Sequence, residues 1–276
     1  MEKIDLHLHT NMSDGVLSPE EVVKLSVSNN CFKISITDHE IIKKYDDLEE
    51  KYGVTIIPGI EFNTMVRNMH ILGYGMSDID TINKRMTELR AKNEDVCLKV
   101  IDLMKRDGYD ISNEKLVDYL KNENLNYDFI DKRKIVKYLI YMGYVNNILD
   151  AYNNLIGFNQ QFYVPNYKIS PYEIIDLVNN CGGIAVLAHP NTMSFTNNQL
   201  YEETKKLRLN GLSGIEVIND KMILNYNNLY EQIAEDLNLL KTVGTDFHDP
   251  KTDNIGISVN EKIFDNLSKK MILSKL

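Results

Sequence analysis

Short apolar runs alternate with amphipathic stretches along most of the chain, and this order predicts strands followed by helices. The amphipathic stretches have apolar residues at helical spacing, and two of them begin with a Ser-Pro-x-Glu sequence that is typical of a capped helix start. The expected strands lie at 4–9, 33–37, 54–57, 70–74, 183–188, 214–218 and 239–243. The expected helices between them lie at 20–29, 171–180, 198–209 and 228–238, and helix-like sequence also ends at 52. The alternation indicates the α/β class.

The pattern changes between about 80 and 162. All six prolines lie outside 59–164, and no histidine occurs between 71 and 188. Helical spacing of apolar residues runs through most of this stretch, with Gly108 and Gly143 where helices would stop. The expected helices here are 82–105, 114–121, 132–142 and 146–156. We therefore expect a main domain of 1–79 and 163–276, interrupted by a helical insertion domain at 80–162.

Composition narrows the class of protein. Acidic residues outnumber basic ones by 40 to 31, and the net charge of −9 argues against a broad basic face for duplex nucleic acid. The three cysteines are far apart and form no Cys-x-x-Cys pair, which is typical of reduced thiols in a cytoplasmic protein. No apolar run is long enough to span a membrane, and candidate site residues begin at residue 5, where a leader would lie. We expect a cytoplasmic protein without a membrane partner.

Each of the six histidines lies in or beside an apolar run. They are His7, His9, His39, His70, His189 and His248. In an extended strand Asp5, His7 and His9 would share one face, because side chains alternate. Taken alone, such a short pair favours a solvated strand edge over a metal site, because the pattern often arises by chance. Polar residues at the ends of later strands favour one shared site, because strand ends converge in a β/α barrel. Those residues are His39, Glu61, His189, Asp246 and His248.

Seven short motifs together resemble the PHP (polymerase and histidinol phosphatase) superfamily. They are Asp5-Leu6-His7-Leu8-His9-Thr10, Ser13-Asp14-Gly15, Thr37-Asp38-His39, Pro58-Gly59-Ile60-Glu61, His70-Ile71-Leu72-Gly73-Tyr74, Ala188-His189-Pro190 and Gly244-Thr245-Asp246-Phe247-His248. Their order and spacing are most similar to bacterial metal-dependent phosphoesterases that hydrolyse nucleoside 3′,5′-bisphosphates and, in some members, short RNA from the 5′ end. The resemblance implies a distorted (β/α)7 barrel of the TIM-like PHP fold with a helical insertion.

The resemblance also implies a trinuclear metal site that is assembled from nine side chains. One metal would be held by His7, His9, Glu61 and Asp246, a second by Glu61, His70 and His189, and a third by Asp14, His39 and His248. His7, His9, Glu61, His189 and Asp246 would serve catalysis by attack of a metal-bound hydroxide. A nitrogen and carboxylate shell without thiolate suits three divalent ions of Zn, Mn or Fe. Asp5 and Asp38 would orient ligand imidazoles.

The expected substrate-binding residues form a basic cluster in the insertion. Lys132-Arg133-Lys134 stands where the subgroup has Arg-Pro-His, so it would bind substrate phosphate, although a solvated basic helix start explains it equally well. The expected partner is a small phosphorylated substrate, a nucleotide or short RNA. Two other functions stay open: a phosphatase of another small ester such as histidinol phosphate, and a non-catalytic metal-dependent binding module. The oligomeric state is open as well.

Overall fold

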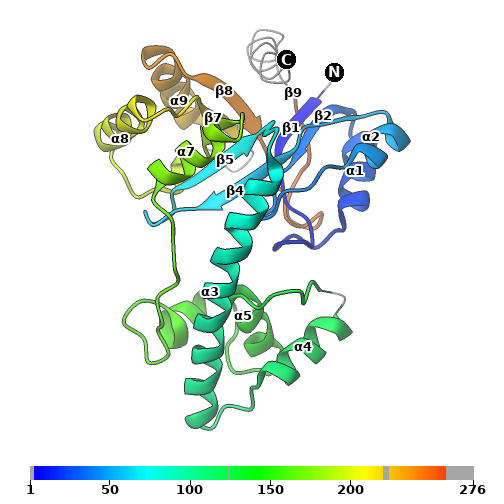
Figure 1. The fold of residues 1–276 in the computed structure, drawn as a ribbon, viewed down its shortest axis with the longest axis vertical. Coiled ribbons are helices and arrows are strands. Elements are labelled where there is room, and N and C mark those ends of the chain that lie inside the picture. Colours follow the sequence, from blue (N-terminus) through cyan, green and yellow to red (C-terminus); the bar gives the residue numbers. More distant parts are fainter. Residues whose placement is uncertain (1–2, 124, 220–223, 259–276) are drawn as a thin grey trace. The chain divides into compact units, whose positions relative to one another are not determined.

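The computed structural model describes residues 3–123, 125–219 and 224–258 (Figure 1). Its strands form two sheets, and the expected α/β class is confirmed. The four-stranded sheet has the order β3 (Thr55–Ile56), β2 (Cys31–Ile36), β1 (Lys3–Leu8) and β9 (Ile257–Ser258). The five-stranded sheet has the order β4 (Gly59–Asn63), β5 (His70–Tyr74), β6 (Ile184–Leu187), β7 (Gly214–Asn219) and β8 (Leu240–Gly244). The expected main domain ends at 276, and its last residues, 259–276, lie outside the described ranges.

Strand direction in the five-stranded sheet differs from a simple repeat of strand and helix. β6, β7 and β8 are parallel, but β5 runs antiparallel to both β4 and β6. Glu61 therefore lies within β4, opposite Leu72 of β5, and the expectation that it follows the end of a strand is wrong. Ile60 and Phe62 on either side of it are fully buried, which is why this short apolar segment forms a strand of its own.

Single bridges join the two sheets close to the histidine-bearing segments. Leu8 at the end of β1 pairs with Phe247, and His39 pairs with Glu61. The N–H of His9 donates to the Phe247 carbonyl at 2.9 Å, and the N–H of Glu40 donates to the Glu61 carbonyl at 3.0 Å. The described strands do not form a closed ladder, so the (β/α)7 barrel stays a prediction from the resemblance.

Helices cover these sheets much as the apolar spacing predicts. They are α1 (Pro19–Ser28), α2 (Asp46–Tyr52), α7 (Pro171–Asn180), α8 (Asn197–Leu209) and α9 (Leu224–Asp236). Both predicted capping boxes are present, because Ser18 pairs with Glu21 and Ser170 with Glu173. α7 packs on β5 and β6, and α9 packs on β7 and β8 (Figure 1).

The four-stranded sheet has a compact apolar core beneath α1. Val22 and Val23 of α1 are fully buried in one cluster with Ile34 of β2 and Leu8 of β1. Burying an aliphatic side chain of this size is worth about 1.5–3 kcal/mol. This cluster therefore holds the carboxyl end of β1 in place through Leu8, which lies between His7 and His9 in the sequence.

The chain divides into two compact units, 1–84 with 169–276 and 85–168. The second unit is helical and has its own core, in which Leu116, Leu139 and Phe162 are among the buried side chains. α3 (Ile79–Arg106) runs from the first unit into the second, followed by α4 (Asn113–Asn122), α5 (Lys132–Tyr141), α6 (Ile148–Ala151) and the π-helix η1 (Tyr152–Ile156). Gly108 and Gly143 follow α3 and α5 with φ of 91° and 73°, a conformation that suits glycine at a helix end. No helix among the described residues is long and apolar enough to cross a membrane.

Candidate metal centre

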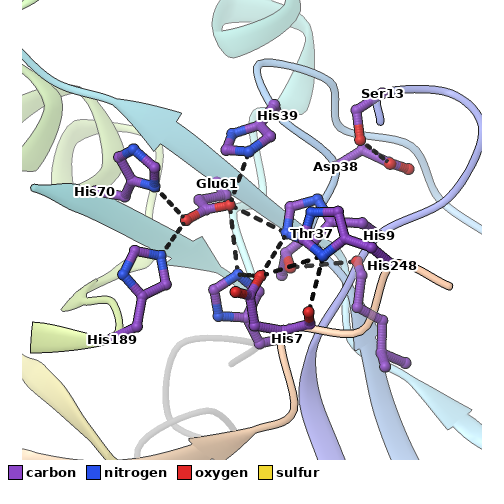
Figure 2. A network of polar contacts seen from close by, with 12 residues as sticks. His7, His9, Ser13, Thr37, Asp38, His39, Glu61, His70, His189 and His248 are labelled. Atoms are coloured by element: carbon purple, nitrogen blue, oxygen red, sulfur yellow. Dashed lines mark hydrogen bonds and ion pairs between the residues drawn. The ribbon is translucent and has the colours of Figure 1, made fainter. Parts of the chain in front are cut away.

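The structure brings all six histidines into one cluster in the first unit (Figure 2). Neighbouring imidazole rings lie 4.2–5.5 Å apart between centroids, from the stacked pair His9–His248 to the pair His7–His189. His7 lies in β1 and His70 in β5, and the other four histidines lie in the segments that follow β1, β2, β6 and β8. The interpretation of scattered solvated histidines is therefore wrong for this chain.

Glu61 lies at the centre of the cluster with only 1% of its surface exposed. Each of its two carboxylate oxygens faces imidazole nitrogens, as Figure 2 shows. Oε2 lies 3.4 Å from His7 Nε2, 3.1 Å from His9 Nε2 and 3.4 Å from His39 Nε2, and Oε1 lies 2.7 Å from His70 Nδ1 and 2.8 Å from His189 Nε2. One carboxylate thus links five histidines.

Two aspartates complete the cluster on its more exposed side. Asp246 Oδ1 lies 3.4 Å from His7 Nε2 and 3.3 Å from His9 Nε2. Asp14 Oδ1 lies 3.5 Å from both His9 Nδ1 and His248 Nε2. Among the described residues, three groups of donor atoms lie close enough to hold an ion. They are His7 with His9, Glu61 and Asp246; His9 with Asp14, His39 and His248; and His39 with Glu61 and His70.

These groups differ in detail from the ligand sets that the resemblance implies. The group of His7, His9, Glu61 and Asp246 matches the first implied set. The group at Asp14 contains the third set and adds His9. In the second set, His70 and His189 both face Glu61 Oε1. This carboxylate oxygen lies between the two imidazole nitrogens.

Close backbone approach at Gly244 lets the end of β8 lie against His7. A Cβ atom at this position would lie 2.3 Å from the His7 Cβ and 2.8 Å from its backbone nitrogen, which no side chain could tolerate. Two residues later Asp246 has φ of 54°, a left-handed conformation that aspartate adopts more readily than most residues. The turn directs the Asp246 carboxylate toward the two histidines of β1.

Asp5 and Asp38 are buried, as the resemblance leads us to expect. Their hydrogen-bond partners, however, are backbone and hydroxyl groups and not imidazoles. Asp5 accepts hydrogen bonds from the Thr245 N–H at 2.9 Å and from its hydroxyl at 2.7 Å. Asp38 accepts from the Thr10 N–H at 2.8 Å and from its hydroxyl at 2.7 Å. The expectation that these residues orient imidazoles is wrong; they fix the loops that carry Asp246 and Asp14.

Sequence reasoning missed a carboxylate that contacts one of these imidazoles. Glu216 of β7 is fully buried, and its Oε1 lies 3.1 Å from His7 Nδ1. Its Oε2 accepts a hydrogen bond from the His189 N–H at 2.7 Å. The available signal was an acidic residue in the otherwise apolar strand 214–218, because a buried acid needs partners.

The electrostatics of the cluster favour a bound cation. Burial opposes the charged form of the His9 imidazole, but the facing carboxylates of Asp246 and Glu61 outweigh it and raise the pKa of His9 to about 10. Burial likewise opposes ionisation of Asp246, and the His7 and His9 imidazoles overcome it and hold the pKa of that carboxyl below its usual range. The carboxylates are thus ionised and attract positive charge.

The buried imidazole nitrogens provide a direct test of whether metal ions fit. His7 Nε2, His9 Nδ1 and His9 Nε2 are buried and have no hydrogen-bond partner in the described part of the chain. Buried polar atoms are rarely left in this state, and each of these nitrogens faces carboxylate oxygens. A divalent ion would satisfy both kinds of atom, and the nitrogen and carboxylate donors suit Zn, Mn or Fe. Divalent metal ions therefore fit this site.

The cysteines lie apart from this chemistry. Cys31, Cys97 and Cys181 are free and buried, and none belongs to a potential metal group among the described residues.

The basic cluster of the insertion lies at the start of α5 in the second unit. Lys132 and Lys134 are only 8% and 5% exposed, so the interpretation of a solvated basic helix start is wrong for both. The Lys132 ammonium donates to the Val164 carbonyl, and the Lys134 ammonium donates to the Phe129 carbonyl at 2.6 Å. Arg133 is half-buried. Burial lowers the pKa of both lysines from 10.5.

The chain is similar to known proteins over nearly its whole length. A 5′–3′ exoribonuclease of Haemophilus influenzae is 25% identical over 258 residues, which cover 90% of this chain and 91% of that protein. A 3′,5′-nucleoside bisphosphate phosphatase of Chromobacterium violaceum is 21% identical over 256 residues, which cover 91% and 88%. The fold is similar to that of a candidate metal-dependent phosphoesterase of Bifidobacterium adolescentis, with a TM-score of 0.81, 21% identity and coverage of 97% and 96%.

The PHP domain family matches residues 5–173. This range is more than half of the chain, begins in β1 and includes His7, His9, Asp14, Glu61 and His70. The chain belongs to the PHP domain family.

Proposed function

We propose that the chain is a metal-dependent phosphoesterase that hydrolyses a phosphate monoester of a small nucleotide, such as a nucleoside 3′,5′-bisphosphate, or the 5′ ends of short RNA. The chain is a hydrolase of phosphoric ester bonds, in keeping with its family and with similar proteins whose names include a bisphosphate phosphatase and an exoribonuclease. The choice between these two substrates is the finer part of the proposal.

The observation that carries the proposal is the shared carboxylate of Glu61. A buried carboxylate that faces five imidazoles is costly unless positive charge offsets it, and Glu61 together with these histidines would hold divalent metal ions. We propose three ions, each with its own set of side chains. The sets are His7, His9, Glu61 and Asp246; Glu61, His70 and His189; and Asp14, His39 and His248.

The bound ions would supply positive charge to phosphate oxygens and lower the pKa of a water molecule, so that hydrolysis proceeds near neutral pH. The chain's residues hold those ions in a fixed arrangement that binds the phosphate group. His7, His9 and Glu61 are almost fully buried, whereas His70 and His248 are 24% and 28% exposed. We infer that the phosphate ester approaches from the side of His70 and His248.

Lys132, Arg133 and Lys134 are proposed to bind a second phosphate or the nucleotide. Each lysine ammonium has three donors and uses one on a backbone carbonyl, so two remain for phosphate. We expect Lys132→Ala, Arg133→Ala and Lys134→Ala each to raise KM several-fold, with bound metal and kcat nearly unchanged. Steady-state kinetics and elemental analysis measure both, with Lys121→Ala on the exposed face of α4 as a control. Kinetics equal to those of the control would remove the cluster from substrate binding.

The decisive experiment measures phosphate release with Mn²⁺ from adenosine 3′,5′-bisphosphate, a 5′-phosphorylated trinucleotide and histidinol phosphate. We expect turnover of one of the first two, and at least a thousandfold loss of kcat in Asp246→Ala and His189→Ala, because each variant removes a proposed metal ligand. Asp102→Ala, an exposed aspartate of α3, serves as the matched control.

Turnover of histidinol phosphate alone would make the chain a phosphatase of another small ester. Binding of metal and nucleotide without any turnover would make it a non-catalytic binding module. Unchanged turnover in Asp246→Ala and His189→Ala, with both variants folded by circular dichroism, would remove those residues from the mechanism.

A further inference from the structure

Glu216 joins two histidines that come from different sheets. It lies in the five-stranded sheet on β7, and its carboxylate faces the His7 imidazole of β1 in the four-stranded sheet. The other oxygen accepts a hydrogen bond from the backbone N–H of His189, directly after β6. We propose that Glu216 is a positioning residue that orients His7 and His189 for metal binding; this inference rests on the proposed function.

The orientation of His7 follows from which ring nitrogen Glu216 occupies. The Glu216 carboxylate, 3.1 Å from Nδ1, accepts a hydrogen bond from the Nδ1–H of the neutral imidazole, and in this tautomer the lone pair is on Nε2. Nε2 lies 3.4 Å from both Glu61 Oε2 and Asp246 Oδ1, is buried and has no hydrogen-bond partner among the described residues. Glu216 therefore presents the free nitrogen of His7 to the two carboxylates that would share its metal.

The packing around Glu216 leaves little freedom for either group. A Cβ atom at Gly244 would lie 2.3 Å from the His7 Cβ and 3.0 Å from Glu216 Oε1, so β8 closes over both. Glu216 itself is fully buried and lies on β7 between β6 and β8. Rigid support of this kind lowers the cost of ordering a ligand when the ion binds.

Two buried donors require two acceptor atoms at position 216, and a glutamate side chain provides both. The His7 Nδ1–H and the His189 N–H each need an acceptor, and the two carboxylate oxygens provide one each. A glutamine has only one acceptor oxygen. In Glu216→Gln the side-chain volume is kept, but one buried donor faces an NH₂ group, so the His7 ring or the His189 backbone must move.

A purely structural role for Glu216 would affect the whole unit alike. The positioning role predicts a selective effect, because Glu216 contacts His7 and His189, whereas His39 Nε2 and His248 Nε2 face Asp14 at 3.7 Å and 3.5 Å. A metal at those three residues should bind in the variant as in the wild type.

The test measures Zn²⁺ binding by the full chain after removal of bound metal, in competition with a chromogenic chelator. We expect Glu216→Gln to bind its weakest-held Zn²⁺ ten- to a hundredfold less tightly than the wild type, the usual effect of losing a carboxylate behind a ligand imidazole. Anomalous scattering from crystals grown with Zn²⁺ should show reduced occupancy beside His7 or His189 and full occupancy beside His248.

Glu49→Gln is the matched control, because Glu49 also accepts a backbone N–H, that of Ile56, at 2.9 Å, and belongs to none of the potential metal groups among the described residues. Equal Zn²⁺ affinity in Glu216→Gln and Glu49→Gln would overturn the inference, as would an equal loss of Zn²⁺ at all positions. If Glu216→Gln does not fold, Glu216→Asp tests the same support, because it keeps the charge and both acceptor oxygens but draws them away from His7 Nδ1 and the His189 N–H. Absence of phosphate release by the wild type would overturn the proposed function but leave these Zn²⁺ measurements valid.

Discussion

At the scale of single residues, the chemistry of the site depends on carboxylates that are buried together with imidazoles. Glu61, Glu216 and Asp5 are almost completely buried, and each has several partners. Burial raises the pKa of Asp5 to about 6 in spite of four hydrogen bonds that lower it. A buried acid destabilises the folded state unless such partners are present. The folded chain must therefore supply these partners, and the acids in turn fix the segments that supply them.

The same burial makes the thiols inert, and this gives a residue-scale prediction. Burial, with a smaller contribution from the Asp5 carboxylate, raises the pKa of Cys31 to about 12, and burial raises the pKa of Cys97 to about 12 as well. At pH 8 only about one in 10⁴ of such thiols is ionised. We expect no reaction with Ellman's reagent in the folded protein and three equivalents after unfolding in guanidinium chloride. Rapid reaction of one equivalent before unfolding would contradict the buried placement.

Residue types and spacing predicted much of the site, but only for residues with a recognisable local motif. His7 and His9 stand out because two imidazoles on one strand face are rare, and the structure places both beside Glu61. Glu216 has no such motif; its partner His7 is 209 residues away, and only the three-dimensional fold brings the two together. Burial of Lys132 and Lys134 was equally hidden, because a basic run has the same sequence whether it is solvated or packed against carbonyls.

At the scale of the elements, helix ends carry the clearest signals. Ser170 begins α7 with its hydroxyl 3.3 Å from the Tyr172 N–H, and its own N–H donates to Glu173 Oε2 at 3.2 Å. We expect Ser170→Ala to lower the free energy of unfolding by about 1 kcal/mol, because a cap for the first backbone donors is lost. Urea unfolding measures the change.

Ser28→Ala is a suitable comparison, because this hydroxyl lies at the exposed end of α1 and donates to the Leu25 carbonyl. We expect a change within about 0.5 kcal/mol for that surface position. Equal losses in the two variants would contradict the assignment of Ser170 as a stabilising cap.

Strand direction could not be read from the sequence in the same way. The run His70–Tyr74 is apolar and short, and nothing in it distinguishes a parallel from an antiparallel strand. Its direction is set by pairing with β4 and β6, which are separated along the chain by the whole insertion. Helices depend mainly on local periodicity and caps, so their positions were predictable, whereas sheet pairing depends on distant segments.

At the scale of the whole molecule, the metal ions are expected to stabilise one unit selectively. All three potential metal groups among the described residues lie in the first unit, whereas the second has its own apolar core. We expect removal of metal with EDTA to lower the melting temperature of the first unit by about 10 °C, since saturating ligand at a thousandfold its Kd contributes about 4 kcal/mol. Differential scanning calorimetry with and without added Mn²⁺ measures this.

The melting transition of the second unit provides the internal control for that experiment. It should keep its temperature in EDTA, because its core consists of side chains such as Leu116 and Phe162 that bind no metal. An equal shift of both units, or no shift of the first, would contradict this assignment of the metal groups.

The single bridges between the two sheets have a consequence for how the ends of the chain are held. Leu8 pairs with Phe247 and His39 with Glu61, and no longer ladder of hydrogen bonds connects the sheets among the described strands. An ion bound by His7, His9, Glu61 and Asp246 would therefore act as a cross-link, comparable to a disulfide that closes a very long loop. The backbone N–H groups of His9 and Glu40, which donate across this junction to Phe247 and Glu61, should therefore exchange with deuterium faster once metal is removed.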